Sequence, residues 1–468
     1  MPLGAVAELA DGRLASGPAA RHALRVTTDT RALRPGDLFV ALRGDHFDGH
    51  DFVAQAAQQG AVGVLVSRPD SASAVPAGCA VIRVEDTLAG LQRLAKNYRR
   101  TLTVKIVAVT GSNGKTSTKE FVAAVLGARF KVHKTAGNLN NHIGVPLTVL
   151  GIDDTHAYAV VELGMNHPGE LAPLVEIARP DLGIITNIGW AHVEAFGGRD
   201  EIALEKARVF AALPADGLAV VNGDDELSLT VARPLTVARA VTVGTGADGD
   251  YQIVLKNSSP AATEFWFGRT SAGAGGVVVA LPLAGWHLAR NAALAAALGA
   301  ELGVAWPCIA AALAAVKLPG NRLSVRKFRR GWLLDDTYNA SPDSMLAAFA
   351  TLQNLPGAGF RVALLGSMGE LGADSERLHR EIGAAAARAG FEILLALGDH
   401  ARDLVAGADA ESGGKVWAKH FADHQALSAA YARVARADDK ILVKGSRSQR
   451  MELAVRELER LERSCCIS

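Results

Sequence analysis

The 468-residue sequence has few cysteines and almost no excess charge of either sign. Its four cysteines stand at positions 79, 308, 465 and 466, too scattered for a disulfide framework, and they fit a reducing compartment such as the cytoplasm. With 49 basic and 48 acidic residues, the charge indicates neither nucleic acid nor a membrane surface as a partner. The last four residues match a prenylation pattern, but no polybasic stretch precedes them.

Long uncharged apolar runs are also missing. The N-terminal stretch MPLGAVAELADGRLASG has no basic region and no long apolar segment, so we expect no signal peptide. The longest weakly charged stretch, 292–316, is dominated by alanine and contains Glu301, Gly303 and Pro307. It predicts two helices of a soluble core rather than a membrane span. The length itself indicates about three domains.

Residues 109–118, VTGSNGKTST, resemble a phosphate-binding loop. The usual spacing G-x-x-x-x-G-K-[ST] would place a glycine at position 109, where this sequence has valine, so the motif is a shortened variant. An apolar strand at 106–109 enters the loop and a helix follows it, which is the context that such a loop requires. Backbone N–H groups from Gly111 to Lys115 would surround phosphate oxygens, with Lys115 at the β- and γ-phosphates and Thr116 on Mg²⁺. The alternative is a glycine turn without a ligand.

Apolar strands at 157–164, 182–189 and 218–224 alternate with helices, which predicts a parallel sheet flanked by helices. Glu162 ends the first of these strands, where a carboxylate would reach Mg²⁺, unless it is a solvated charge. His192 follows the second strand and is either a metal ligand or a packed or surface histidine. The stretch 241–283, rich in threonine, valine and glycine, suggests a β-rich insertion in the same domain, of open function.

Lys206 lies in DEIALEKARVF, a helix by its spacing, where a solvated lysine is the ordinary interpretation. An ammonium is no metal ligand, and only a derivatised lysine such as a carbamate would supply oxygens to a cation. Further along, His287 and Asn291 share one face of a helix start, where they either contact a base or form a buried pair. The Pro-Gly sequence before Arg322 predicts a hinge within 316–322, and Arg322 could reach a phosphate if the domains close.

Beyond the hinge, four apolar strands separated by helices predict a smaller doubly wound domain. Three of its strands end in polar loops, each of which could be an ordinary turn: DDTYNAS (335–341), GSMGELG with Glu370, and KGSRS with Lys444. Ser341, Pro342 and Asp343 have the pattern of a helix N-cap, a first-turn proline and an acid. Because the carboxyl ends of parallel strands share one edge, these loops predict a site that faces the nucleotide domain.

Together these stretches resemble the Mur ligases of bacterial cell-wall synthesis over essentially the whole chain. The resemblance is carried by TDTRALRPGDLFVALRGDHFDGHDF (28–52), TGSNGKTSTKE (110–120), TAGNLNNHIGVPLT (135–148), VVELGMNHPGEL (160–171), ITNIGWAHVEAFG (185–197), DDTYNASPDSM (335–345), LGSMGELG (365–372) and KGSRSQRME (444–452). The NLNNHIGVPLT and DDTYNA stretches favour the members that add D-alanyl-D-alanine. One departure is Ser341, where many members have asparagine.

The resemblance implies a three-domain α/β enzyme. Residues 1–100 would form a small α/β domain that holds a UDP-muramoyl substrate, 101–318 a central P-loop domain with a parallel sheet that binds ATP, and 319–468 a Rossmann-like domain that closes on ATP and the dipeptide. The implied reaction phosphorylates the free carboxylate of a UDP-N-acetylmuramoyl-tripeptide with ATP and Mg²⁺ and joins the resulting acyl phosphate to D-alanyl-D-alanine. The enzyme would be a cytoplasmic monomer without nucleic-acid or membrane partners.

The resemblance also implies roles for residues that match its motifs. Catalytic roles fall to Lys115, Glu162, His192 and Lys206, and the metal ligands would be Thr116, Glu162, His192 and a carbamylated Lys206. ATP would contact Thr110, Gly111, Ser112, Asn113, Gly114, Lys115, Thr116, Asn291, Arg322 and Asp336. The substrates would contact Thr28, Asp29, Thr30, Arg31, Asp48, Gly49, His50, Asn138, Asn140, Asn141, Tyr338, Asn339, Lys444, Ser446 and Arg447.

Two other functions fit the same residues. A different carboxylate–amine ligase of this fold, either another Mur enzyme or a polyglutamate-adding synthetase, would share the nucleotide site and differ in its amine. A regulatory protein that binds ATP and changes shape without ligation would not need the three strand-end loops of the last domain. The sequence leaves open whether the third residue of the tripeptide is meso-diaminopimelate or lysine.

Overall fold

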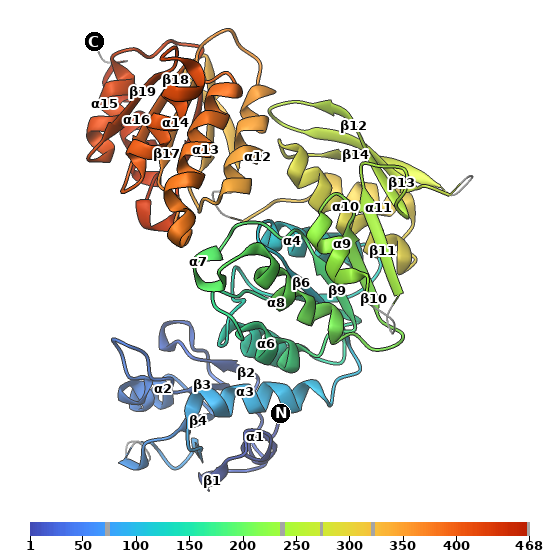
Figure 1. Cartoon of the computed structure of the whole chain (residues 1–468). Coiled ribbons are helices and arrows are strands. Elements are labelled where there is room, and N and C mark those ends of the chain that lie inside the picture. Colours follow the sequence, from blue (N-terminus) through green and yellow to red (C-terminus); the bar gives the residue numbers. More distant parts are fainter. Residues whose placement is uncertain (71–74, 235–238, 272–274, 320–322, 466–468) are drawn as a thin grey trace.

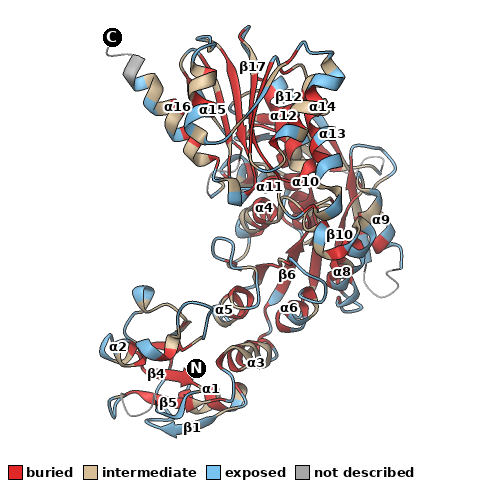
Figure 2. Cartoon of the chain, turned by 60° about the vertical axis from the view of Figure 1, so that its left-hand side comes forward, coloured by how far each residue is buried: buried red, intermediate tan, exposed pale blue. Residues whose placement is uncertain are grey.

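The chain forms three β-sheets, each with its own helices. The computed structural model describes residues 1–70, 75–234, 239–271, 275–319 and 323–465. Figure 1 shows the sheets following one another along the molecule, from the N-terminal unit at the bottom to the C-terminal unit at the top. In Figure 2 the strands of the central and C-terminal sheets are buried, whereas outer helix faces and loops are exposed. These features confirm the predicted α/β class.

The N-terminal unit is a five-stranded sheet in the order β1-β5-β4-β3-β2. Its elements are α1 (Leu3–Leu9), β1 (Arg13–Ser16), β2 (Arg25–Thr27), β3 (Asp37–Val40), α2 (Val53–Gln58), β4 (Gly63–Val66), β5 (Ala80–Arg83) and α3 (Thr87–Arg99). Strands β2 to β5 are parallel, and β1 pairs antiparallel with β5. The carboxyl ends of β2, β3 and β4 therefore lie at one edge.

The central unit is a nine-stranded sheet in the order β14-β13-β12-β11-β10-β9-β6-β8-β7. Its first half contains β6 (Lys105–Thr110), α4 (Lys115–Gly127), β7 (Val132–Lys134), α5 (Gly144–Leu150), β8 (Tyr158–Glu162), α6 (Leu171–Ala178), β9 (Leu182–Ile185), α7 (Val193–Phe196), α8 (Arg199–Ala211), β10 (Leu218–Asn222) and α9 (Glu226–Ala232). Side chains 106–109 of β6 are fully buried. Burial of each large aliphatic side chain among them contributes about 1.5–3 kcal/mol to the stability of the fold. This burial explains the uninterrupted apolar run before the loop.

The stretch 241–283 is β-rich and extends the central sheet, so it belongs to the same domain, as expected. It forms β11 (Arg239–Gly244), β12 (Tyr251–Ser258), β13 (Thr263–Arg269) and β14 (Gly276–Leu281). Strand β11 is parallel to β10 and to β12, and β12, β13 and β14 form an antiparallel edge. The alanine-rich stretch then forms two helices as predicted, α10 (Trp286–Glu301) and α11 (Trp306–Ala314).

The C-terminal unit is a six-stranded sheet in the order β15-β16-β20-β17-β18-β19. Its elements are β15 (Ser324–Phe328), β16 (Gly331–Asp336), α12 (Pro342–Gln353), β17 (Arg361–Gly366), α13 (Ser375–Arg388), β18 (Ile393–Leu397), α14 (Ala401–Ser412), β19 (Trp417–Phe421), α15 (His424–Ala432), β20 (Lys440–Lys444) and α16 (Glu452–Cys465). All pairs are parallel except β15 with β16. The prediction of four strands missed the two edge strands, β15 and β19.

Buried polar contacts join the N-terminal unit to the central one. Arg99, the last residue of α3, is 6% exposed. Its Nε donates to the carbonyl of Ala178 at 2.9 Å, and its terminal nitrogen lies 2.9 Å from Asp181 Oδ2. Asp181 Oδ2 also accepts the backbone N–H of Ile106 on β6 at 2.8 Å. Helix α3 is thereby held against the central sheet. Among all described residues, no helix is long and apolar enough to cross a membrane.

Candidate active site

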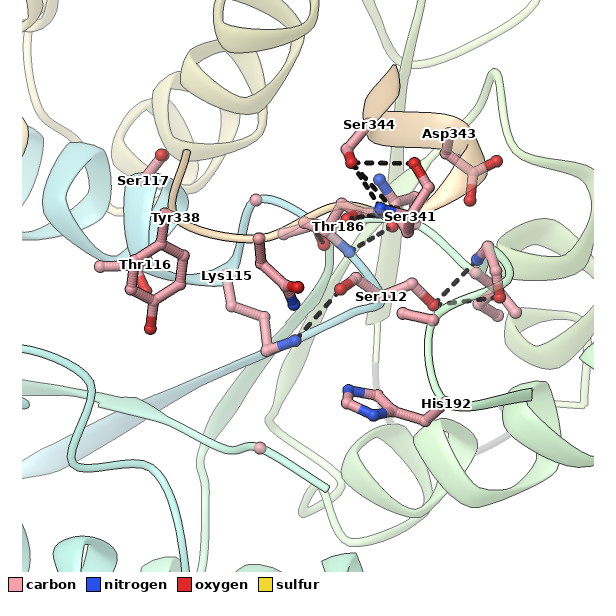
Figure 3. A pocket seen from close by; sticks show the side chains of 18 of the residues that line it. Ser112, Lys115, Thr116, Ser117, Thr186, His192, Tyr338, Ser341, Asp343 and Ser344 are labelled. Atoms are coloured by element: carbon pink, nitrogen blue, oxygen red, sulfur yellow. Dashed lines mark hydrogen bonds between the residues drawn. The ribbon is translucent and has the colours of Figure 1, made fainter. Parts of the chain in front are cut away.

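A cavity of about 1540 Å³ lies between the central and C-terminal units. It is lined by the loops that follow β6, β8, β9 and β10 on one side and β16, β17 and β20 on the other. The four strands of the central sheet are neighbours, in the order β10-β9-β6-β8, and so are the three strands of the C-terminal sheet, in the order β16-β20-β17. The loops leave at the carboxyl ends of these strands, which is where open α/β sheets bind ligands. Figure 3 shows side chains of both units meeting at this cavity.

The phosphate loop connects β6 to α4, as its sequence predicts. Gly114 caps α4 with a φ of 79°, and Gly111 has a φ of 147°, so both need a conformation that other residues rarely adopt. A Cβ on Gly114 would lie 2.3 Å from Asn291 Nδ2, and one on Gly111 would lie 1.8 Å from Thr186 Oγ1. Asn291 of α10 therefore contacts this loop directly. Thr110, at the end of β6, is fully buried.

The loop after β9 holds the phosphate loop in place. Asn187 accepts the backbone N–H of Ser112 with its carbonyl and that of Asn113 with its side-chain Oδ1, both at 2.9 Å. Thr186 Oγ1 donates to the carbonyl of Asn113 at 2.5 Å. We did not single out Thr186 and Asn187 from the sequence, although both follow an apolar strand and the strand-end rule would have identified them.

Lys115 turns back over its own loop. Its Nζ donates to the carbonyls of Gly111, at 2.7 Å, and Ser112, at 3.2 Å. Figure 3 shows the bond to Ser112. The ammonium is thus placed beside the N-terminal end of α4, whose free backbone N–H groups and positive dipole end favour an anion.

Glu162 at the end of β8 is 1% exposed. Its Oε1 accepts from Thr116 Oγ1 at 3.0 Å and from Asn140 Nδ2 at 2.8 Å. Its Oε2 has no hydrogen-bond partner among the described residues, and Lys119 Nζ lies 3.7 Å away. A buried carboxylate oxygen without a hydrogen bond, next to a threonine hydroxyl at a phosphate loop, fits a divalent cation.

No three histidine, cysteine, aspartate or glutamate side chains form a metal-binding group in the part of the chain that the structure describes. Mg²⁺ is usually held by one or two carboxylates together with waters and substrate phosphates. Thr116 and Glu162 therefore fit the predicted magnesium site. His192 lines the same cavity, where its ring contacts Glu370 of the C-terminal unit.

His192 has a left-handed backbone conformation, with a φ of 67°, at the start of α7. Its Nδ1 lies 2.5 Å from Glu370 Oε2, a residue of the C-terminal unit. The imidazole holds the pKa of the Glu370 carboxyl below its usual value against the opposing effect of burial. The carbonyl of Glu370 also accepts the N–H of Glu194 at 3.1 Å. One glutamate thus contacts the loop of His192 with both its side chain and its backbone.

Lys206 on α8 is 1% exposed and does not line the cavity. Burial lowers the pKa of its ammonium well below the usual value, and the positive charge of Lys115 lowers it further, while Glu205 opposes the shift. The interpretation of Lys206 as a solvated surface lysine, which its helix spacing suggested, is therefore wrong. A buried amine beside the phosphate-loop lysine is instead a group whose neutral form is favoured.

Asp336 and Lys444 end neighbouring parallel strands, β16 and β20, and form an ion pair. Lys444 Nζ also donates to the carbonyl of Asn339 at 2.8 Å, and the N–H of Arg447 donates to Asn339 Oδ1 at 3.3 Å. Across the cavity, burial lowers the pKa of His287 to about 4, although nearby Asp336 opposes the shift. The three strand-end loops of this unit do meet at one edge, as the sequence predicts.

Direct contacts join the two sides of the cavity. Ser341 Oγ donates to Asn113 Oδ1 of the phosphate loop at 3.0 Å, and the N–H of Ser341 donates to Ser344 Oγ at 2.9 Å, so this serine both caps α12 and contacts the other unit. Asn138 Nδ2 donates to the Tyr338 hydroxyl at 3.3 Å. The N–H of Trp190 donates to Asp343 Oδ2 at 3.0 Å.

Most of the predicted site residues of the last two units line the cavity. They are Ser112, Asn113, Gly114, Lys115, Thr116, Asn138, Asn140, Asn141, Glu162, His192, Asn291, Asp336, Tyr338, Asn339, Lys444, Ser446 and Arg447. Arg322, like Gly320 and Asn321 of the predicted hinge, lies outside the described residues. The cavity is also lined by three polar residues that our prediction omitted, namely Asn222, Asp224 and Asp225. They lie at the carboxyl end of β10, so the strand-end rule could have identified them.

The predicted substrate residues of the N-terminal unit do not line this cavity. Thr28, Asp29, Thr30 and Arg31 follow β2, whereas Asp48, Gly49 and His50 follow the loop after β3, so both groups lie at the carboxyl edge of that sheet. His50 Nε2 accepts the N–H of Ser67 at 2.9 Å, so its proton is on Nδ1, which donates to Asp48 Oδ1 at 2.6 Å. These residues form a second polar edge.

Comparison with known proteins agrees with this architecture. Three family descriptions match the chain: "Mur ligase family, catalytic domain" over 23–99, "Mur ligase middle domain" over 109–299, and "Mur ligase, glutamate ligase domain" over 321–447. The UDP-N-acetylmuramoyl-tripeptide–D-alanyl-D-alanine ligase of Bacillus subtilis is 38% identical, covering 97% of both chains, and that of Escherichia coli is 40% identical, covering 93% of both.

Solved structures agree as well. MurF from Acinetobacter baumannii superposes with a TM-score of 0.87 at 31% identity, covering 98% of both chains. MurF ligase from Thermotoga maritima in complex with ADP superposes with a TM-score of 0.77 at 28% identity, covering 94% of this chain and 99% of that one. Matches of this identity and coverage leave one conclusion: the chain belongs to the Mur ligase family.

Proposed function

We propose that this protein is an ATP-dependent ligase that adds D-alanyl-D-alanine to UDP-N-acetylmuramoyl-tripeptide and so forms the pentapeptide precursor of peptidoglycan. The observation that supports it most directly is 38–40% identity to ligases of this name over more than nine-tenths of the chain. The cavity adds a physical reason, since it places a phosphate loop opposite three polar strand-end loops of another unit.

ATP would bind at the phosphate loop. The backbone N–H groups of residues 111–115 and the ammonium of Lys115 would hold its phosphates, and Asn291 and Asp336 would contact the nucleotide from either side of the cavity. The structure of the Thermotoga maritima relative contains ADP, which supports this assignment. Thr116 and Glu162 would hold Mg²⁺, which neutralises charge on the phosphates when bound, and His192 is proposed as a further ligand.

Two chemical steps follow from this arrangement. A carboxylate oxygen of the tripeptide attacks the γ-phosphorus of ATP in line, the bond to the β-phosphate oxygen breaks, and ADP and an acyl phosphate form. The amine of D-alanyl-D-alanine then attacks the acyl carbon, the amine loses a proton, and phosphate leaves from the tetrahedral intermediate. Lys115 would stabilise charge on the transferred phosphoryl oxygens in the first step.

Each of the three units would have its own role. We propose that residues 1–100 hold the UDP-muramoyl group at the edge formed by Thr28–Arg31 and Asp48–His50, and that 101–318 bind ATP. Residues 319–468 would close on ATP and place the dipeptide with Lys444, Ser446 and Arg447. Asn138, Asn140 and Asn141 would lie along the peptide, which is consistent with their positions in the cavity. Closure would exclude the water that hydrolyses an acyl phosphate.

Lys206 is proposed to be carbamylated. Its support is the buried environment, which lowers the pKa of the amine and thus favours the neutral nucleophile that reacts with CO₂. We also propose that the protein acts as a monomer in the cytoplasm. One chain supplies both sides of the cavity, which supports the monomer.

Phosphate release tests the proposed function. The purified protein is mixed with ATP, Mg²⁺, UDP-N-acetylmuramoyl-tripeptide and D-alanyl-D-alanine, and each component is then omitted in turn. We expect turnover only in the complete mixture, and mass spectrometry should detect the pentapeptide product. Replacing the dipeptide with glutamate or another amino acid separates this enzyme from other ligases of the family. ATP turnover that is indifferent to both the carboxylate and the amine would contradict the proposal.

A further inference from the structure

Lys119 is a buried charge that the proposed mechanism does not use. It lies one helical turn after Lys115 on α4, and its side chain is 0% exposed. An ammonium loses its hydration when it is buried, so it is retained only where nearby oxygens replace the water. The question is therefore which groups it holds.

Three oxygens surround the ammonium of Lys119. Its Nζ donates to the carbonyl of Gly137 at 2.7 Å, and it lies 3.2 Å from Glu120 Oε1 and 3.7 Å from Glu162 Oε2. The other oxygen of Glu120 forms an ion pair with Lys134 at the end of β7. The result is a row of alternating charges, from buried Glu162 through Lys119 and Glu120 to the half-exposed Lys134.

The row of charges lies under the segment of residues 135–141. Thr135 Oγ1 accepts the N–H of Glu162 at 3.0 Å, and Asn140 Nδ2 donates to Glu162 Oε1 at 2.8 Å, so both ends of the segment are bound to the end of β8. Between them, Lys119 Nζ donates to the carbonyl of Gly137, in the middle of the segment. Asn138, the next residue, lines the cavity and contacts Tyr338.

We propose that Lys119 is a positioning residue that fixes segment 135–141 for the muramoyl peptide. This inference rests on the proposed function. Because a hydrogen bond from a charged donor is stronger than a neutral one, the ammonium sets the place of the Gly137 carbonyl and therefore of Asn138. The same ammonium faces the carboxylate assigned to magnesium, so one buried lysine links the nucleotide side of the cavity to its peptide side.

The first test measures the segment itself, without any substrate. Backbone amide exchange is compared for the wild type, Lys119→Met and the matched control Lys134→Met, which removes the outermost lysine of the same row. We expect exchange in peptides covering 135–143 to accelerate about tenfold in Lys119→Met, as for the loss of one hydrogen bond from a charged donor, and to stay unchanged in Lys134→Met. Unchanged exchange in Lys119→Met would overturn the proposal.

The second test measures turnover of the whole enzyme. Each KM is measured by varying one substrate while the others and Mg²⁺ are saturating. The KM for UDP-N-acetylmuramoyl-tripeptide should rise about tenfold in Lys119→Met, and the KM for ATP should rise much less. Lys134→Met should leave both values within about twofold. An equal rise in both KM values would instead indicate general damage at Glu162 and would contradict the assigned role.

Two outcomes keep the inference separate from the proposed function. If Lys119→Met does not fold, Lys119→Arg takes its place, because it keeps a positive charge near Glu162 but displaces the donor from the Gly137 carbonyl; the same split between the two KM values is expected. If the wild-type protein ligates nothing, the proposed function fails, while the exchange measurement still decides whether Lys119 holds the segment.

Discussion

At the scale of single residues, the ammonium of Lys115 bonds to two backbone carbonyls. It donates to the carbonyls of Gly111 and Ser112 within its own loop. A phosphate oxygen carries full negative charge and binds an ammonium more strongly than a carbonyl does. Binding of ATP would therefore draw Lys115 from its loop toward the phosphates without any large change of the backbone.

Replacing Lys115 tests its assigned role. Lys115→Ala should lower kcat by about 10²–10³, as is typical when one donor to developing charge is removed. Steady-state kinetics at saturating ATP measures the effect, and Lys256→Ala on β12, an exposed lysine far from the cavity, is the control. The melting temperature should stay close to that of the wild type in both variants. Near-normal turnover in Lys115→Ala would exclude it from phosphoryl transfer.

His287 gives a pH-dependent prediction. Its pKa is about 4 in the folded protein and about 6.5 when unfolded, so the unfolded chain binds the extra proton between these values. Stability therefore rises with pH from about 4 to 6.5, and the contribution of the neutral histidine is lost as the pH falls through that window. His287→Gln should flatten this part of the stability profile, as measured by urea unfolding at pH 5 and pH 7.5. A wild-type profile that the substitution leaves unchanged would refute the assignment.

The residues that the sequence identifies well are those whose chemistry is local. Gly114, Lys115 and Thr116 follow from one strand–loop–helix pattern, and Ser341 follows from its capping position. His192 and Glu370 are 178 positions apart in the sequence, and their pairing depends on how two units dock. Nothing in either local sequence specifies such a partner. The buried state of Lys206 was missed for the same reason.

At the scale of elements, burial decides which strands are visible in the sequence. Strands β6, β17 and β20 are buried on both faces and appear as uninterrupted apolar runs. Strand β19, at the edge of the C-terminal sheet, has the sequence WAKHF with no fully buried residue, and β7 has only three residues. Such strands are formed by pairing with a neighbour rather than by their own apolar pattern, so our sequence analysis missed them.

The link between α3 and the central sheet can be tested by comparing two ion pairs of the same helix. Arg99→Met removes the buried one of the two ion-pair partners of Asp181, the other being Lys105, and should cost about 3 kcal/mol of stability. Lys96→Met removes an exposed partner of Glu176, 2.6 Å away, and should cost at most about 1 kcal/mol. Guanidinium unfolding of both variants gives the comparison. Equal costs would show that Arg99 does not hold the two units together.

At the scale of the whole molecule, contacts between the central and C-terminal units gather around Trp190. Its ring lies 5.7 Å from the guanidinium of Arg199, in the central unit, and 5.3 Å from that of Arg377, on α13 of the C-terminal unit. The backbone N–H of Trp190 donates to Asp343, at the start of α12. Because two cations contact one indole from different units, this tryptophan stabilises the docked arrangement that forms the cavity.

Removing the cation that the C-terminal unit contributes should therefore favour an open molecule. Arg377→Ala loses a cation–π contact worth about 0.5–2 kcal/mol, so small-angle scattering should show a larger radius of gyration, with and without ADP. Arg380→Ala on the same helix is the control, because Arg380 pairs with Glu376 and Asp403 of its own unit. If catalysis requires closure, kcat/KM should fall in Arg377→Ala alone. Scattering curves that coincide for all three proteins would mean that other contacts, such as Glu370 with His192, hold the units together without Arg377.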